Sequence, residues 1–171
     1  MEMTAKLQEQ RGEFLFSTAV KLLAAAILLS AGMEVFHVYH TLGVVREKTN
    51  EAVLAVAAVN VAEFYGGARE ADGFARHPED SGTFAYSIAT DDVVDQLIQS
   101  LNATDRKDDD TIVVGSSFNV SALSTRYVNA TGGNLNFQSN LTATVPLKIG
   151  GMLLPAVTKR MEVKTSYAPK F

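Results

Sequence analysis

The N-terminal half of the chain lacks helix-breaking residues over a very long stretch. No proline occurs before Pro78, and only two glycines fall between Glu13 and the pair Gly66 and Gly67. Because proline breaks an α-helix whereas glycine only weakens it, this stretch predicts one helix over residues 13–65, about 80 Å long at 1.5 Å per residue. A rod of that length must project from any domain of ordinary size that the remaining residues form.

The first half of the predicted helix is apolar enough for a lipid bilayer. Residues 14–36 carry only two charges, Lys21 and Glu34, and they would extend about 35 Å, against roughly 30 Å for a hydrocarbon core. The charge-free part, residues 22–33, is short for a span. Three interpretations follow: a marginal membrane anchor, the apolar region of a signal peptide cleaved near Gly32, or a helix that enters the membrane and later leaves it.

The second half of the predicted helix is amphipathic, which favours one continuous helix over a cleaved signal. Charged residues at positions 46–48 and 51 end the compatibility with lipid. Beyond them, apolar residues recur every three or four positions and predict a stripe that packs against a domain. These residues are Val53, Leu54, Ala57, Ala58, Val61 and either Phe64 or Tyr65. Gly66 and Gly67 then predict the C-terminal end of the helix.

The remaining residues predict an α+β domain. A loop over residues 66–89 precedes a short helix over residues 90–102, capped by Thr90 or Asp91. Apolar and polar residues then alternate, most clearly over residues 135–147 and 157–167, and predict antiparallel strands joined by a hairpin loop over residues 150–155. One face of this sheet would be in water and the other would pack on the helices. The expected divisions are a polar leader (1–12), the long helix (13–65) and an exposed α+β domain (66–171).

Composition and motifs argue against several classes of function. A formal net charge of −4 does not supply the basic face that nucleic-acid binding needs. The absence of cysteine excludes thiol catalysis, Cys-based zinc sites and disulfides. The common nucleotide-binding, hydrolase and metalloprotease motifs do not occur, so we expect neither an enzyme nor a cofactor. Glu34, His37 and His40 lie on one helix and cannot converge on one ion, and we expect no metal site.

Four Asn-x-Ser/Thr sequons fall in the C-terminal half of the chain, at Asn102, Asn119, Asn129 and Asn140. They are candidate N-glycosylation sites on an outward surface. The alternative is a polar sheet face that is rich in serine and threonine for solubility alone.

The layout resembles the type IV pilin superfamily, and most closely the TadE-like pilins and pseudopilins. The resemblance rests on Arg11-Gly12-Glu13-Phe14, the apolar segment 14–36, the amphipathic extension to Tyr65 and the C-terminal strand pair. It implies that a prepilin peptidase cuts after Gly12 in the cytoplasmic membrane and leaves Glu13 first. Pilus assembly machinery then adds the subunit to an extracellular filament made of its own copies. Ser17 stands where the superfamily usually has a glutamate.

The expected function is therefore that of a structural subunit. The apolar surface of residues 14–45 would be buried against neighbouring copies in a filament core, and axially staggered copies could pair Glu13 or Glu34 with Lys21, which would set their register. The alternative is a single-pass, membrane-anchored binding or adhesion module that does not polymerise.

Overall fold

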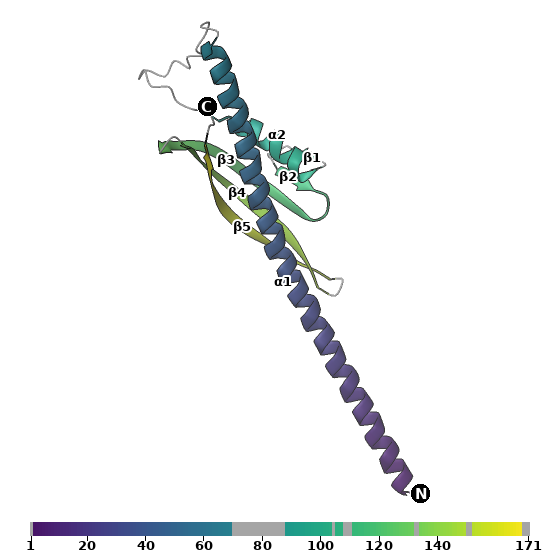
Figure 1. Cartoon of the computed structure of the whole chain (residues 1–171). Helices are drawn as coiled ribbons and strands as arrows, with labels where there is room; N and C mark the ends of the chain where they lie inside the picture. The colour runs from purple at the N-terminus through teal and green to yellow at the C-terminus, as the bar shows by residue number, and fades with distance from the viewer. Residues whose placement is uncertain are drawn as a thin grey trace.

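The computed structural model describes residues 2–69, 88–103, 105–107, 111–131, 134–149 and 152–168. It confirms the α+β class: a long helix α1 (Glu2–Arg69) and a short helix α2 (Thr90–Leu101) precede the strands of an antiparallel sheet. Figure 1 shows α1 as a straight rod. The sheet and α2 lie along its C-terminal half, and its N-terminal half projects away from them.

Helix α1 extends beyond the predicted bounds at both ends. It has 68 residues and is about 100 Å long at 1.5 Å per residue. Residues 2–11 contain neither proline nor glycine, so nothing local stops the helix from beginning at Glu2. The predicted end at Gly66 was wrong, because a glycine costs a helix only about 1 kcal/mol, and α1 continues to Arg69.

The described strands form one sheet in the order β1-β2-β3-β4-β5, and every neighbouring pair is antiparallel. The strands are β1 (Asp105–Lys107), β2 (Thr111–Val114), β3 (Phe118–Thr131), β4 (Asn134–Ile149) and β5 (Met152–Tyr167). The predicted hairpin loop over residues 150–155 was too long, because β5 already begins at Met152. β5 is an edge strand, and Pro155 is tolerated there at a register shift between the strands.

The core lies between α1, α2 and the inner face of the sheet. The predicted stripe on α1 is confirmed at Val53, Ala57 and Val61, which are buried, while Leu54 and Ala58 are half-buried. The buried stripe nevertheless begins earlier, at Val38. Because Val38, Leu42 and Val45 pack inside their own chain, the expectation that residues 14–45 are all free for neighbouring copies was wrong beyond residue 37.

Helix α2 presents an apolar face to this core. Val93, Val94 and Leu97 are buried, and the acidic residues of its first turn suit the positive end of the helix dipole. The predicted cap was wrong: the N-cap is Ala89, which has no side-chain cap. Thr90 is bound elsewhere, because its Oγ1 accepts the backbone N–H of Thr125 at 3.3 Å.

The bare N-cap of α2 gives a prediction on stability. Ala89 already has the extended backbone of an N-cap, with φ −72° and ψ 127°, and its side chain is exposed. Ala89→Asp is expected to stabilise the domain by about 0.5–2 kcal/mol, because aspartate accepts an unsatisfied N–H of the first turn. Thermal unfolding of the full chain in detergent measures the gain. Ala89→Val supplies no acceptor and is the control; an equal rise in Tm for both variants would contradict the prediction.

Polar side chains inside the core are paired. Thr49 Oγ1 donates to the carbonyl of Val45 at 2.8 Å, and the hydroxyls of Thr125 and Ser139 lie 2.9 Å apart. Thr165 Oγ1 donates to Asn50 Oδ1 at 2.7 Å, which ties the edge strand β5 to α1. Among the described residues, no buried side-chain nitrogen or oxygen lacks a partner, as the low dielectric of an interior requires.

Candidate functional site

The most unusual surface of the molecule is the N-terminal half of α1, residues 14–37, which we call the apolar limb. No residue of the limb is buried. Large apolar side chains are exposed along its whole length; Phe16, Leu28 and Phe36, for example, are each 73% exposed. Soluble monomers rarely expose a continuous apolar surface of this size. A surface of this kind is typical of a segment that lies in a membrane or against another molecule.

The limb meets the length and composition needed to cross a membrane. It belongs to a helical segment, Phe14–Ala62, whose most apolar 18-residue window has a mean hydropathy of 2.0 and is 0% buried. A secretion signal near an N-terminus has the same properties. The limb thus indicates membrane association or a secretion signal, in line with the alternatives that the sequence left open.

The two charges of the limb have different surroundings. Lys21 is exposed among apolar neighbours. Glu34 is half-buried, and its Oε1 accepts the backbone N–H of Lys148 at 2.8 Å. Sequence reasoning missed this contact, because the two residues are 114 positions apart and a backbone donor leaves no mark in the sequence. Glu34 therefore already has a partner within its own chain.

The predicted processing site lies within the helix. The backbone of α1 runs through Gly12 and Glu13 without a break. The side chain of Glu13 lies outside the described part of the molecule. Cleavage after Gly12 and the role of Glu13 in register both stay predictions.

The histidines near Glu34 do not gather with it. His37 and His40 are exposed, and the ring of His40 stacks on that of Phe36 with their centroids 6.3 Å apart. In the part of the chain that the structure describes, no three metal-binding side chains come together. The nearby aspartates of the sequence are only partly described: Asp105 lies on β1, and Asp108, Asp109 and Asp110 lie outside the described residues.

Three of the four sequons share one surface, the face of the sheet that points away from the helices, which we call the outer sheet face. Asn119 pairs in register with Thr144, Asn129 with Asn136, and Asn140 with Ser124; all three asparagines are exposed. Asn129 Oδ1 accepts a hydrogen bond from Asn136 Nδ2 at 2.9 Å. The fourth sequon is separate: Asn102 caps the C-terminus of α2 with φ 50°.

The outer sheet face is mostly polar. Polar and charged side chains pair across its strands, as in the bond from Arg126 Nη2 to Gln138 Oε1 at 2.9 Å and the contact between the hydroxyls of Thr144 and Thr158 at 3.2 Å. Such cross-strand pairs stabilise a solvated sheet. This face suits contact with water or attached glycans.

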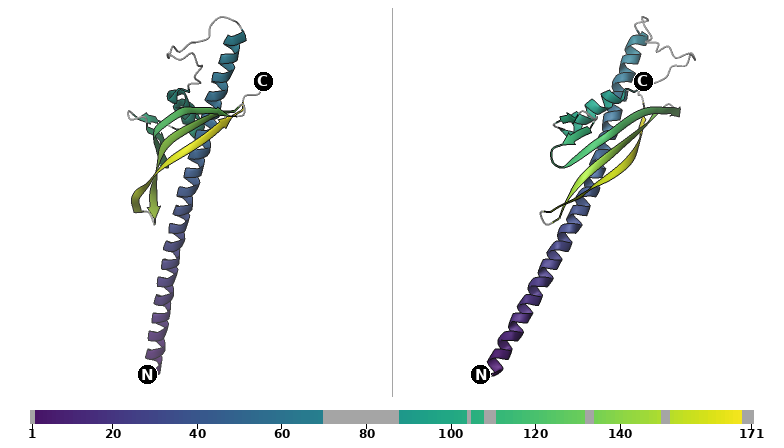
Figure 2. Two further views of the ribbon diagram at one scale, coloured as in Figure 1. Left: turned by 90° about the vertical axis from the view of Figure 1, so that its left-hand side faces the viewer. Right: turned by 180° about the vertical axis from the view of Figure 1, so that it is seen from behind.

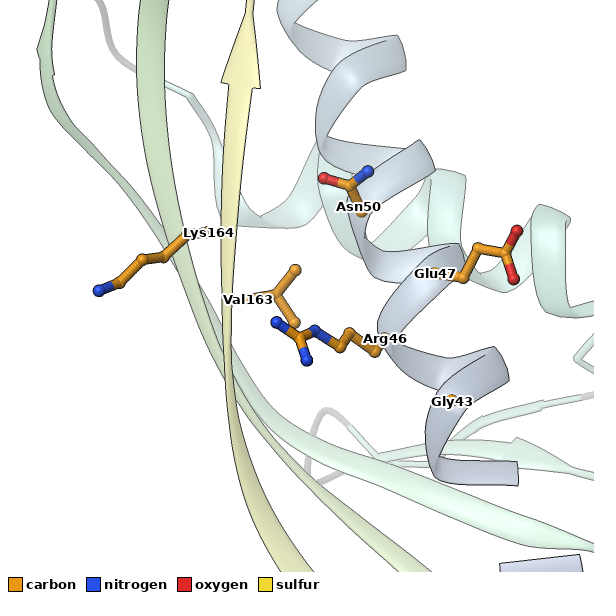
Figure 3. Close-up of a pocket in the computed structure, with 6 residues that line it drawn as sticks. All are labelled: Gly43, Arg46, Glu47, Asn50, Val163 and Lys164. Carbon is orange, nitrogen blue, oxygen red and sulfur yellow. The ribbon is translucent and has the colours of Figure 1, made fainter. Parts of the chain in front are cut away.

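A shallow groove of about 310 Å³ lies between α1 and β5. Gly43, Arg46, Glu47 and Asn50 line it from the helix, and Val163 and Lys164 from the strand. Figure 3 shows Arg46 extended toward Val163, while Glu47 and Lys164 point away from the groove. Its polar groups do not converge on one point as they do in a catalytic pocket.

On α1, the half-buried Lys48 bonds to Glu51, with Nζ and Oε2 2.7 Å apart. This hydrogen bond raises the pKa of Lys48 above its ordinary value. The other charged residues of this stretch, Arg46, Glu47 and Glu51, are exposed.

Comparison with models of protein families, with curated proteins and with solved structures finds no match to this chain. Its pilin-like character accordingly rests on architecture: a long, apolar N-terminal helix that continues into the core of a C-terminal domain built on an antiparallel sheet.

Proposed function

We propose that this chain is a pilin-like structural subunit. Its apolar limb packs against the limbs of other copies in the core of an extracellular filament, and the sheet domain lies on the outside. The observation that carries the proposal is the limb itself, which has no buried residue and is 0% buried over its most apolar window. Burial of such surface against identical helices yields about 25 cal/mol per Å², repeated for every subunit added.

The charges of the limb support self-association more than isolation in lipid. A charge in an apolar environment is costly unless it is paired, and Lys21 lies well inside the limb. Glu13 precedes it by eight residues, or about 12 Å along a helix, and Glu34 follows by about 20 Å. Because Glu34 is already bonded to the chain's own Lys148, we assign Glu13 of a staggered neighbour as the partner of Lys21.

This proposal brings further partners with it. The subunit resides in the cytoplasmic membrane as a precursor, where a prepilin peptidase cuts after Gly12 and the assembly machinery extracts it. No catalytic activity of its own belongs to the proposal. The outer sheet face, with Asn119, Asn129 and Asn140, forms the outside of the filament and carries N-glycans if the host has the pathway.

The second candidate is a membrane-anchored module that displays the domain without polymerising. It is favoured by the span of the limb, since residues 14–36 cover about 35 Å and a hydrocarbon core is about 30 Å thick. The two candidates share the membrane stage and differ in whether copies associate afterwards.

Electron microscopy of material sheared from cells, with intact-mass measurement of the recovered chain, tests the proposal. We expect fibres that contain the chain, with the mass of a chain that begins at Glu13. Glycosylated copies should carry additional mass, and this mass should be lost in Asn→Gln variants of the sequons. A mass that starts at Met1 would show a retained leader. Detergent-soluble monomers without fibres would contradict the filament and favour the anchored module, and a product that starts at Met33 would indicate a secreted domain.

A further inference from the structure

The end of the β4–β5 hairpin is the most apolar exposed part of the sheet. We call residues 147–149 and 152–154 the hairpin tip. Met152 and Leu153 are 75% and 74% exposed, and Leu154 is exposed as well. These side chains interrupt a sheet whose exposed positions are otherwise mostly polar. In water they would be a liability, because an exposed apolar strand end invites association.

The hairpin tip is fixed at one level of α1. Within it, the backbone N–H of Lys148 donates to Glu34 Oε1 at 2.8 Å, and Leu153 lies directly opposite Lys148 in the strand register. Leu153 is thus beside the part of α1 where the apolar limb ends. Figures 1 and 2 show the hairpin pointing along α1 toward its N-terminus, that is, toward the limb.

This placement fixes the depth of the tip whenever the limb is in a membrane. Glu34 is the last charge of the limb on the side of the domain and would lie at the boundary between lipid and water. Ile149 and Met152 continue one residue past Lys148 and Leu153, which is about 3 Å along a strand. The apolar side chains then lie in the region of the headgroups and upper acyl chains, where interfacial segments insert their apolar residues by about 5–10 Å.

The remaining groups at this level suit the same environment. Met33 and Phe36, within one helical turn of Glu34, are exposed and apolar. Lys148 is exposed and can bind lipid phosphates while its stem follows the apolar surface. One carboxylate oxygen of Glu34 is occupied at this level, because it accepts the backbone N–H of Lys148.

We propose that the hairpin tip inserts into the headgroup region of the membrane that holds the subunit before assembly. The inference rests on the membrane stage of the proposed function. It gives the domain two contacts with the bilayer, the limb and the tip. Two contacts fix the tilt of the domain and the depth of Glu34, whereas a single helix leaves both to fluctuate. The tip must leave the lipid when the subunit enters a filament.

The test exploits the absence of tryptophan from the chain. Three full-length variants each carry one tryptophan: Leu153→Trp at the tip, Leu28→Trp in the limb, and Ser166→Trp at the far end of β5 as the control in water. Each is reconstituted into phosphatidylcholine and phosphatidylglycerol vesicles whose lipids are brominated either near the headgroup or deep in the acyl chain. Tryptophan emission then reports contact with lipid and its depth. Thermal unfolding verifies that the three variants fold alike.

We expect the emission of Leu153→Trp to shift to shorter wavelength and to lose most of its intensity with shallow bromine. Leu28→Trp should be quenched more by deep bromine, and Ser166→Trp by neither. Quenching of Leu28→Trp with water-like emission from Leu153→Trp would overturn the tip inference alone. Water-like emission from both would overturn the membrane stage as well. If the emission of Leu153→Trp shifts to shorter wavelength only in lipid-free filaments, the tip contacts a second copy of the chain. That result would overturn the lipid contact.

Discussion

Cells that produce the Lys21→Glu variant are expected to display few or no filaments, although the domain folds normally. In the proposed core, Lys21 is surrounded by apolar side chains and pairs with Glu13 of a neighbour. Reversal of its charge leaves two carboxylates together without a cation. Loss of a buried pair costs about 3–5 kcal/mol, which weakens each subunit addition roughly a hundredfold to several-thousandfold. Electron microscopy of sheared material measures filament number, and thermal unfolding verifies the domain.

Charge-swap variants identify the partner. Lys21→Arg keeps the charge and should keep filaments. Combining Lys21→Glu with Glu13→Lys should restore them in part, provided that intact mass shows normal processing after Gly12. Combining Lys21→Glu with Glu34→Lys should not restore filaments, because Glu34→Lys also removes the acceptor of the Lys148 N–H. Normal filaments from Lys21→Glu alone would show that Lys21 has no role in subunit register.

Val53→Asp is expected to prevent the domain from folding. Val53 is 0% exposed and belongs to the core cluster that α1 forms with α2 and the sheet. An aspartate there either buries a charge or must be protonated, at a cost of several kcal/mol. Total stabilities of domains are about 5–15 kcal/mol, so this cost removes most of the stability. Far-UV circular dichroism and limited proteolysis of the full chain in detergent measure the loss of the sheet.

The same helix supplies a matched control. Val59 lies six residues further along α1 and is 54% exposed. Val59→Asp makes the same chemical change and places the carboxylate in water, so the Tm should change little. If both variants unfold alike, the effect comes from helix propensity and not from the buried stripe. If Val53→Asp and Val59→Asp both resist protease as well as the unchanged chain, α1 does not pack on the sheet as described.

Much of the fold could be predicted from local patterns. The apolar face of α2, with Val93, Val94 and Leu97, follows helical spacing, and β4 alternates cleanly from Leu135 to Val145. These signals are strong because each element has one face in the core and one in water. The apolar limb could be predicted too, since few charges fall within residues 14–36. The fold class and the apolar limb can therefore be predicted from the sequence.

The parts that could not be predicted depend on context. The buried stripe begins at Val38, but apolar residues such as Phe36 and Val44 surround that stretch on all sides of the helix, and this hides its periodicity. The bond between Glu34 and the Lys148 N–H joins residues distant in sequence through a backbone group. Ala89 shows that a cap can lack its usual residue when neighbouring contacts hold the turn. In each case tertiary packing, and not the local sequence, determines the observed feature.

The continuity of α1 from the limb into the domain has a geometric consequence. A single uninterrupted helix, Glu2–Arg69, gives the apolar limb and the sheet a common rotational phase. Each residue turns the helix by about 100° and advances it by 1.5 Å. One residue inserted after Phe36 would therefore turn the whole sheet, with its asparagines, by about 100° around the axis relative to the limb. The number of residues along α1 therefore sets the direction in which the outer sheet face points relative to the limb.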